Sequence, residues 1–230
     1  MKMTELIKKF RPPAFPGSYI LSLEGIEGAG KSTQIVKCKE YLESLDFRVL
    51  VLREPGGTSF GEKLRQAILS SSAEIHPVAE LHLFAASRAQ LLTEVTLKEL
   101  AVPNTIIIYD RYLDSTLAYQ GEARGLGFET ILNCHSSFPL TLVPHLTFYL
   151  DIPASLSQER QKLRNSPKDY FEKQGAEFYQ NLVAGYNKAC ELFPNRIVRI
   201  NGSQNEEGVF EEIKSILENL IKQKYETTEN

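Results

Sequence analysis

One eight-residue segment constrains the fold of this chain more than any other feature. Its sequence is Gly25-Ile26-Glu27-Gly28-Ala29-Gly30-Lys31-Ser32, which fits the pattern G-x-x-x-x-G-K-[ST]. The segment stands between a β-prone run at 19–24 and a stretch of helical period at 31–44. Glycines let the backbone curl so that successive N–H groups point inward at a phosphate, and the following helix adds its positive end. This context favours a phosphate-binding loop over an ordinary glycine-rich turn.

The chemistry of this loop assigns candidate roles to its residues. We expect Lys31 to reach the β and γ oxygens of a nucleoside triphosphate, and Ser32 to offer its hydroxyl to Mg²⁺. The predicted triphosphate-binding residues are Gly25, Ile26, Glu27, Gly28, Ala29, Gly30, Lys31, Ser32 and Thr33. A GTPase would also need Asn-Lys-x-Asp after a strand, but the only Asn-Lys pair, at 187–188, is followed by Ala-Cys. The loop alone leaves the phosphate acceptor open, as water, a protein, a metabolite or another nucleotide.

The fold class follows from the alternation of short β-prone runs with longer helical stretches. Strands are expected at 19–24, 47–53, 105–109, 146–150 and 197–200, and helices at 31–44, 60–69, 77–100 and after residue 205. Nearly continuous apolar strands separated by helices predict an α/β, P-loop NTPase fold, whose five-stranded parallel sheet has helices on both faces. We expect a flexible leader at 1–18, a single domain at 19–222 and a polar tail at 223–230.

Charge and cysteine content limit the partners and the compartment. The 230 residues include 26 Lys and Arg against 29 Asp and Glu, so a net charge of −3 favours neither nucleic acid nor an anionic membrane. The longest apolar stretches, such as 105–109, are far shorter than the roughly 20 residues that span a bilayer. The three cysteines, Cys38, Cys134 and Cys190, have no metal-ligand spacing. We therefore expect a cytoplasmic protein with free thiols.

Polar residues follow the third expected strand. In a doubly wound sheet, Asp110 and Arg111 would lie at the carboxyl edge beside the loop. Asp110 can hold Mg²⁺ directly or through water, and Arg111 can bind a second phosphate with two hydrogen bonds. A salt bridge at the strand end is the alternative. Further along, a short helix would present polar groups suited to a base and a sugar, from Ser115, Thr116, Tyr119 and Gln120.

An arginine interrupts the apolar face of the helix expected at 77–100. Arg88 lies one turn after Phe84 on that face. Two interpretations remain open at this point. Either the side chain extends outward to water, or Phe84 stacks on a ring while Arg88 donates to a carbonyl oxygen of the same ring.

A second group of cations occurs at 160–164. Arg160 and Arg164 share one helical face, a like-charge pair that costs roughly 0.2 to 0.5 kcal/mol when alone. A helix-breaking stretch at 165–168 follows, so we expect a short flap, about 156–172, whose cations close over the transferring phosphates. A solvated charged helix face is the alternative.

With these residues in place, the chain resembles the thymidylate kinase family from about residue 19 to residue 220. Several separated signatures agree in order. They are the loop at 24–32, Arg53-Glu54-Pro55-Gly56-Gly57-Thr58, Phe84-Ala85-Ala86-Ser87-Arg88, Asp110-Arg111-Tyr112 with Ser115 and 118–121, and Tyr149-Leu150-Asp151. Jointly these signatures are far more specific than the loop alone.

The resemblance implies an activity and a set of roles. The activity is Mg²⁺-dependent transfer of the γ-phosphate of ATP to dTMP, giving dTDP, in a cytosolic homodimer. Glu27 would bind the deoxyribose 3′-hydroxyl, Phe84 would stack on thymine, and Tyr119 would close the sugar pocket against a 2′-hydroxyl. The implied dTMP-binding residues are Glu27, Arg53, Glu54, Phe84, Arg88, Arg111, Ser115, Thr116, Tyr119 and Gln120. The catalytic residues would be Lys31, Arg111, Arg160 and Arg164, and the Mg²⁺ ligands Ser32 and Asp110.

The chain departs from the family pattern in the flap. Ala29 stands where some relatives carry a loop arginine, so the resemblance assigns the cationic help to the flap, as in bacterial-type members. That type has Asp-Arg-x-Glu after the flap, whereas this chain has Asp-Tyr-Phe-Glu at 169–172. Arg160, Lys162 and Arg164 therefore remain alternatives for the cation that touches the transition state.

Two other functions compete with dTMP phosphorylation. One is a P-loop kinase that acts on a different nucleotide or on a deoxynucleoside. The other is a non-catalytic adaptor, in which ATP only stabilises a surface for a protein partner. Intact Lys31, Ser32, Asp110 and Arg111 favour an enzyme, and ADP release with different acceptors discriminates the three.

Overall fold

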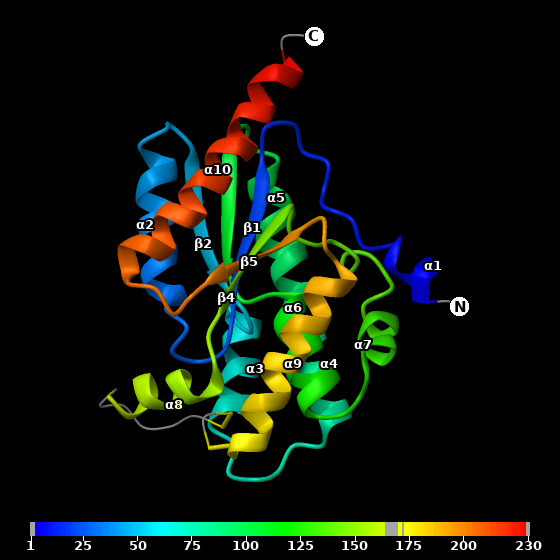
Figure 1. The fold of residues 1–230 in the computed structure, drawn as a ribbon. Coiled ribbons are helices and arrows are strands. Elements are labelled where there is room, and N and C mark those ends of the chain that lie inside the picture. Colours follow the sequence, from blue (N-terminus) through cyan, green and yellow to red (C-terminus); the bar gives the residue numbers. More distant parts are fainter. Residues whose placement is uncertain (1–2, 164–169, 172, 229–230) are drawn as a thin grey trace.

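The centre of the computed structural model is a parallel sheet with strand order β2-β3-β1-β4-β5 (Figure 1). The structure describes residues 3–163, 170–171 and 173–228. The strands are β1 (Tyr19–Glu24), β2 (Arg48–Arg53), β3 (Thr105–Asp110), β4 (Leu146–Asp151) and β5 (Ile197–Asn201). Every pairing between neighbouring strands is parallel. The predicted five-stranded parallel sheet is therefore confirmed.

Helices cover both faces of this sheet (Figure 1). One face carries α2 (Lys31–Glu43) and α10 (Glu206–Thr228), which pack against each other. The other face carries α4 (Pro77–Leu91), η1 (Leu92–Thr96), α5 (Leu97–Leu100), α6 (Leu113–Thr116), η2 (Leu117–Ala123) and α9 (Ala176–Leu192). The helix expected at 77–100 is present, with one π-helical stretch, η1, inside it. Outside these layers lie α3 (Ser59–Leu69), α7 (Phe128–Cys134) and α8 (Ala154–Lys162).

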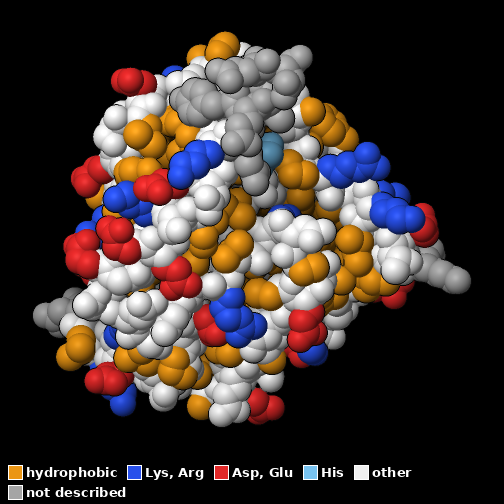
Figure 2. Space-filling model, turned by 45° about the horizontal axis from the view of Figure 1, so that its top comes forward, with side chains coloured by type: hydrophobic (Ala, Val, Ile, Leu, Met, Phe, Trp, Pro, Cys, Tyr) orange, Lys and Arg blue, Asp and Glu red, His pale blue; other side chains and the backbone are white. Residues whose placement is uncertain are grey.

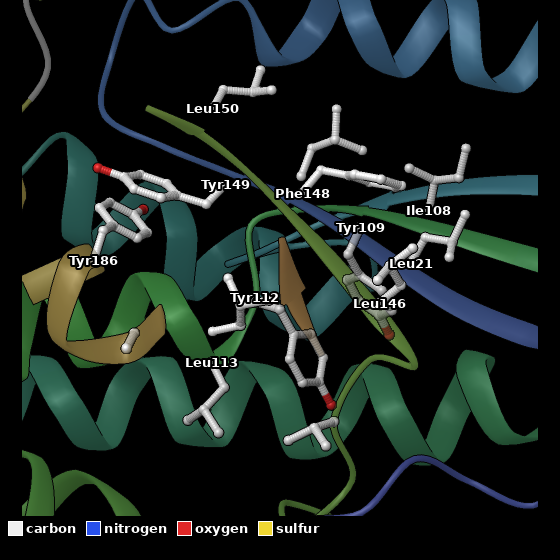
Figure 3. Close-up of a cluster of buried hydrophobic side chains, with 14 of the residues drawn as sticks. Leu21, Ile108, Tyr109, Tyr112, Leu113, Leu146, Phe148, Tyr149, Leu150 and Tyr186 are labelled. Atoms are coloured by element: carbon white, nitrogen blue, oxygen red, sulfur yellow. The ribbon is translucent and has the colours of Figure 1, made fainter. Parts of the chain in front are cut away.

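The hydrophobic core lies between the central strands and the two helical layers. Almost every residue of β1, β3 and β4 is buried, whereas β2 and β5 at the edges alternate between buried and exposed positions. Figure 3 shows Leu21, Ile108 and Phe148 from the three central strands, together with the buried rings of Tyr109 and Tyr112. Strands buried on both faces need apolar side chains in both directions, which explains their continuous apolar sequences.

The carboxyl ends of four strands meet at one edge of the sheet. The loop at 25–30 leaves β1, the segment at 54–58 leaves β2, residue Arg111 follows β3, and α8 follows β4. In the strand register, Asp110 pairs with Arg53 on one side and with Leu23 on the other. Since ligands of open α/β sheets bind outside the carboxyl ends of the strands, this edge is the candidate site.

The N-terminal segment differs from the flexible leader that we expected. Residues 3–7 form α1 (Met3–Ile7), where Leu6 is wholly buried, and the ring of Phe10 packs edge-on against Phe193 at 6.5 Å between centroids. The backbone of Arg11 exchanges hydrogen bonds with the segment at 141–143. The prediction was wrong for residues 3–18 because it weighed their lysines and overlooked an apolar pair four residues apart.

The C-terminal helix is longer than expected. The backbone of α10 continues to Thr228, beyond Lys222, where we had placed the start of a polar tail. Residues 206–221 supply a nucleus, because Val209, Ile213 and Leu217 are buried. Once such a nucleus exists, each added residue costs little, so the polar residues that follow extend the helix.

The surface shows no broad area of one charge on the face drawn in Figure 2, where lysine and arginine lie interspersed with aspartate and glutamate. This mixture agrees with the net charge of −3. Among the described residues, no helix combines the length and the apolar character that crossing a membrane requires.

Replacing Leu6 with alanine tests the packing of the N-terminal segment. Because the side chain is wholly buried, we expect the free energy of unfolding to fall by roughly 2 to 5 kcal/mol, as for other buried leucines. Urea unfolding followed by circular dichroism measures this change. Lys8→Ala is the control, since that side chain is 69% exposed. Equal stability of Leu6→Ala and the parent chain would show that the segment does not contribute to the core.

Candidate active site

The glycine-rich loop forms a concave turn at the end of β1. Gly25 has a φ of 140°, and a Cβ there would lie 2.7 Å from the carbonyl oxygen of Leu150, so only glycine fits. Gly30, with a φ of 96°, precedes the first residue of α2 and has no side chain to cap that helix. The first N–H groups of α2 are therefore available to an anion.

Lys31 lies against its own loop. Its Nζ donates to the carbonyl oxygens of Gly25 at 2.9 Å and Ile26 at 3.2 Å. Burial, followed by the charge of Arg111, lowers the pKa of Lys31 to about 8. A phosphate in the loop would favour the charged form of the amine, because an opposite charge at short range offsets desolvation.

A groove beside the loop brings the two predicted Mg²⁺ ligands together. Ser32 and Asp110 both line it, as does Arg53. Asp110 Oδ1 is buried and has no hydrogen-bond partner among the described residues. A carboxylate oxygen and a hydroxyl are donors that Mg²⁺ accepts, with phosphate oxygens and water completing its shell. The described residues include no group of three or more His, Cys, Asp or Glu that could hold a metal by itself.

A second pocket opens on the other side of the loop and contains about 490 Å³ of space that is open to solvent. All but one of the predicted dTMP-binding residues line it: Glu27, Glu54, Phe84, Arg88, Arg111, Ser115, Thr116, Tyr119 and Gln120. The exception is Arg53, whose side chain is 53% exposed and pairs with Glu62 at 3.0 Å. We call this cavity the acceptor pocket.

Arg88 lies at the base of the acceptor pocket and is only 1% exposed. Its guanidinium forms an ion pair with Glu54 at 2.6 Å and donates to Thr116 Oγ1 at 3.1 Å. It also lies over the ring of Tyr112, 4.9 Å from the centroid. The side chain points into the protein, so the interpretation as an outward, solvated arginine was wrong.

His135 completes this cluster, a role that no sequence pattern indicated. Its Nε2 lies 2.8 Å from Arg88 Nη1, and its Nδ1 lies 2.8 Å from the carbonyl oxygen of Ile131. Burial, then the charge of Arg88, lowers the pKa of His135 to about 3. The neutral ring therefore donates to Ile131 through Nδ1 and accepts from Arg88 through Nε2.

Glu27 and Arg111 meet at the mouth of the loop. Arg111 Nη2 donates to Glu27 Oε1 at 2.8 Å, and the hydroxyl of Tyr119 donates to the same oxygen at 2.5 Å. Burial acts to raise the pKa of Glu27, but Arg111, Lys31 and the Tyr119 hydrogen bond together lower it below its usual value. Glu27 is therefore ionised, and its other oxygen, Oε2, is buried without a hydrogen-bond partner among the described groups.

The start of the predicted flap contacts the loop directly. On α8, Arg160 Nη1 donates to the carbonyl oxygen of Gly28 at 3.0 Å, and Ser157 Oγ donates to that of Glu27 at 2.6 Å. The structure thus brings Arg160 to the phosphate loop, whereas Lys162 is the last residue of α8. Arg164, the other predicted flap cation, lies outside the described residues.

The residue that follows the departure at Tyr170 contributes an aromatic ring to the acceptor pocket. Phe171 lines this pocket, and its ring lies 6.2 Å from that of Phe84 and 5.3 Å from that of Tyr119. Tyr170 beside it lies under the guanidinium of Arg124, 5.4 Å from the ring centroid. Phe171 therefore forms part of the pocket wall, and Tyr170 packs next to it, 5.2 Å between ring centroids.

The fold and this edge define a P-loop nucleotide kinase, with a phosphate loop, a groove suited to Mg²⁺ and a separate pocket for an acceptor. A family model described as thymidylate kinase matches residues 23–213. The thymidylate kinases of Thermosipho africanus and Chlorobium luteolum are each 41% identical to the chain. They align over 86% and 90% of this chain and 96% and 98% of their own lengths. The crystal structure of thymidylate kinase from Ehrlichia chaffeensis superposes with a TM-score of 0.69 at 27% identity, covering 88% of this chain and 99% of that one. The chain belongs to the thymidylate kinase family.

Substituting His135 with leucine tests the support beneath Arg88. The change leaves Arg88 Nη1 buried without its acceptor, so we expect a loss of about 1 to 3 kcal/mol in the free energy of unfolding at neutral pH. Because the pKa of His135 falls to about 3 in the folded state, the parent chain loses stability as the pH drops from the unfolded value near 6.5 toward 3. The variant should lack this part of the acid sensitivity.

Urea unfolding at several pH values measures both effects. His82→Leu is the matched control, because His82 is exposed and lies outside the acceptor pocket. If both leucine variants were equally stable at each pH, the hydrogen bond to Arg88 would contribute nothing.

Proposed function

We propose that this chain is a dTMP kinase that transfers the γ-phosphate of ATP to dTMP, giving dTDP and ADP. One observation carries the proposal: the phosphate loop lies directly beside a pocket whose polar groups complement a nucleotide. The ammonium of Lys31 and the guanidinium of Arg111 donate to the same carbonyl oxygen, that of Gly25, each at 2.9 Å. The cations for a donor phosphate and an acceptor phosphate are therefore neighbours.

The base of the acceptor pocket suits an uncharged pyrimidine. Arg88 supplies donors for a ring carbonyl, and its partner Glu54 holds it in place. Gln120 Oε1 is buried without a partner among the described residues, so it can accept from a ring N–H. Phe84 and Phe171 provide apolar surface for the ring faces and a methyl group. Thymine offers a carbonyl, an N–H and a methyl group in one ring.

The upper part of the pocket suits a deoxyribose and its phosphate. Glu27 Oε2 has no partner within the described part of the chain and can accept a hydrogen bond from the 3′-hydroxyl. Tyr119, only 5% exposed, packs against this carboxylate and restricts space next to the sugar. Arg111 binds Glu27 through Nη2 and Gly25 through Nη1, so its Nε–H and its second Nη2 proton can donate to the acceptor phosphate.

The mechanism follows from what phosphoryl transfer needs: two nucleotides in line, water excluded, and negative charge neutralised. No strong base is required, because a phosphate monoester oxygen is already ionised at neutral pH. Lys31 and Arg160 would hold the donor, and Arg111 the acceptor phosphate. Ser32 and Asp110 would hold Mg²⁺, which would add positive charge at the β and γ oxygens.

Replacing Lys31 or Arg111 with alanine tests the catalytic assignment. Each variant removes a cation from the path of the transferring group, so we expect kcat to fall by about a hundredfold or more. Steady-state kinetics with ATP, dTMP and Mg²⁺ measure the loss, and circular dichroism checks that the fold is intact. Near-normal turnover in a variant would refute the role of that residue.

An acceptor screen tests the substrate. A coupled ADP-release assay with dTMP, dUMP, UMP, CMP, AMP, GMP and thymidine should give the highest kcat/KM for dTMP. A better acceptor among the others would favour the alternative kinase, and no ADP release with any acceptor would favour the adaptor. Replacing Arg88 with methionine, which keeps length without donors, should lower kcat/KM for dTMP by about tenfold or more.

We further propose a cytoplasmic homodimer. Membership of the thymidylate kinase family supports the dimer, and three free cysteines, Cys38, Cys134 and Cys190, support a reducing compartment. Sedimentation equilibrium of the purified chain would distinguish a dimer from a monomer.

A further inference from the structure

A buried carboxylate that the proposed reaction does not use lies beneath Arg111. Glu24 is the last residue of β1 and is wholly buried. Its Oε1 accepts from the backbone N–H of Tyr112 at 2.6 Å. Its Oε2 accepts from Ser115 Oγ at 2.6 Å and from the hydroxyl of Tyr186 at 3.2 Å. Both oxygens of Glu24 are thus occupied by donors from the segments that follow β3 and from α9.

Arg111 shares two of these partners. Its Nη1 lies 3.2 Å from Ser115 Oγ and 3.1 Å from the hydroxyl of Tyr186. A hydroxyl has one proton and two lone pairs, so a hydroxyl that donates to Glu24 presents lone pairs to Arg111. A guanidinium has only donors, so it needs a lone pair of each hydroxyl. The two hydroxyl oxygens also lie 2.8 Å apart, so a proton that does not point to Glu24 can lie between them.

We propose that Glu24 is a positioning residue for the acceptor phosphate: it orients the hydroxyls of Ser115 and Tyr186 as acceptors for Arg111, and so directs that guanidinium. This inference rests on the proposed function, in which Arg111 binds the phosphate of dTMP. Glu24 itself does not line the acceptor pocket. It acts on dTMP only through the two hydroxyls and Arg111.

The surroundings hold these hydroxyls in place. The ring of Tyr186 stacks on that of Tyr149, with 4.8 Å between centroids and 16° between planes (Figure 3). The backbone of Arg111 has a φ of 71°, and its N–H donates to the carbonyl oxygen of Leu23 at 3.2 Å. A non-glycine residue in this left-handed region persists only where the surrounding structure fixes it. The backbone of Arg111 is therefore fixed by the structure around it, and the direction of its guanidinium is set by the side-chain hydrogen bonds described above.

The charge of Glu24 depends on several neighbouring groups. Burial, then the carboxylate of Asp114 on α6, raises the pKa of Glu24 to about 7, against the opposing effects of Ser115, Arg111 and the Tyr112 N–H. The other titratable or charged groups that face it are Lys31, Arg88, Tyr112 and Tyr186. Above pH 7 the ionised form accepts from both hydroxyls. Below pH 7, the protonated carboxyl of Glu24 must itself donate a hydrogen bond to one of the two hydroxyls. At least one hydroxyl then turns its own proton away from Glu24.

The variant Glu24→Gln tests the proposal with almost no change in shape. The N–H of Tyr112 requires the amide oxygen, so the NH₂ group faces Ser115 and Tyr186 and forces both hydroxyls to accept from it. Their protons lose Glu24 as an acceptor and must point toward the other hydroxyl or toward Arg111, so the two hydroxyls can no longer both present lone pairs to Arg111 as they do in the parent chain. We expect KM for dTMP to rise about tenfold or more while KM for ATP changes little. In the parent chain, kcat/KM for dTMP should fall as the pH drops below about 7, and this limb should be absent in the variant.

Asp114→Asn is the matched comparison, another buried carboxylate changed to its amide. Asp114 bonds to Arg196 and Thr147 and not to Arg111. Because its charge raises the pKa of Glu24, its removal should move the acid limb to lower pH and leave KM for dTMP at pH 8 nearly unchanged. Urea unfolding of each variant separates these effects from loss of the fold.

A double-mutant cycle with Tyr186→Phe tests the route. If Glu24 acts through this hydroxyl, the double variant should raise KM for dTMP by clearly less than the product of the two single changes. A dTMP KM and pH profile unchanged in Glu24→Gln, or fully multiplicative effects in the cycle, would overturn the inference. Absence of dTMP phosphorylation in the parent chain would instead refute the proposed function, so the two failures are distinguishable.

Discussion

Parallel pairing of β1 with β3 decides where the functional groups of this chain lie. Because the two strands run side by side in the same direction, the phosphate loop after Glu24 and the Asp110–Arg111 pair emerge at one edge. The pairing of β3 with β2 brings the segment of Glu54 to the same edge. If one strand were reversed, Lys31 and Arg111 could not donate to the same carbonyl oxygen, and a donor and an acceptor phosphate would not meet.

Bringing cations together in this way requires compensation from buried carboxylates. Arg88 is paired with Glu54, and Arg111 with Glu27. A buried ion pair gains little net stability, because the desolvation of both charges offsets their attraction. Here each carboxylate also has an oxygen without a partner among the described residues, Glu54 Oε1 and Glu27 Oε2. A buried acceptor without a donor destabilises the folded protein. A ligand that donates to these oxygens removes part of this penalty, and the free energy recovered contributes to its binding.

How much of this site could be predicted from the sequence depends on how far apart the interacting residues lie along the chain. The phosphate loop and the strands are local patterns, and the structure confirms the strands within a residue or so of the predicted bounds. The burial of Leu6 was missed because the segment that packs on it is far away in the sequence. The contact of His135 with Arg88 spans 47 positions, and no local pattern in α7 indicates it. Tyr170 was noticed as a departure, but only the fold shows that the ring of its neighbour Phe171 lies beside Phe84.

The shared carbonyl oxygen of Gly25 also connects the two substrates. Lys31 and Arg111 carry like charges and donate to one oxygen, and Arg111 contributes to the lowered pKa of Lys31. A phosphate bound to either cation reduces their repulsion and releases one donor from the Gly25 carbonyl. In the proposed reaction, binding of one anion would therefore offset part of the repulsion between the two cations, which would favour occupation of both sites before transfer.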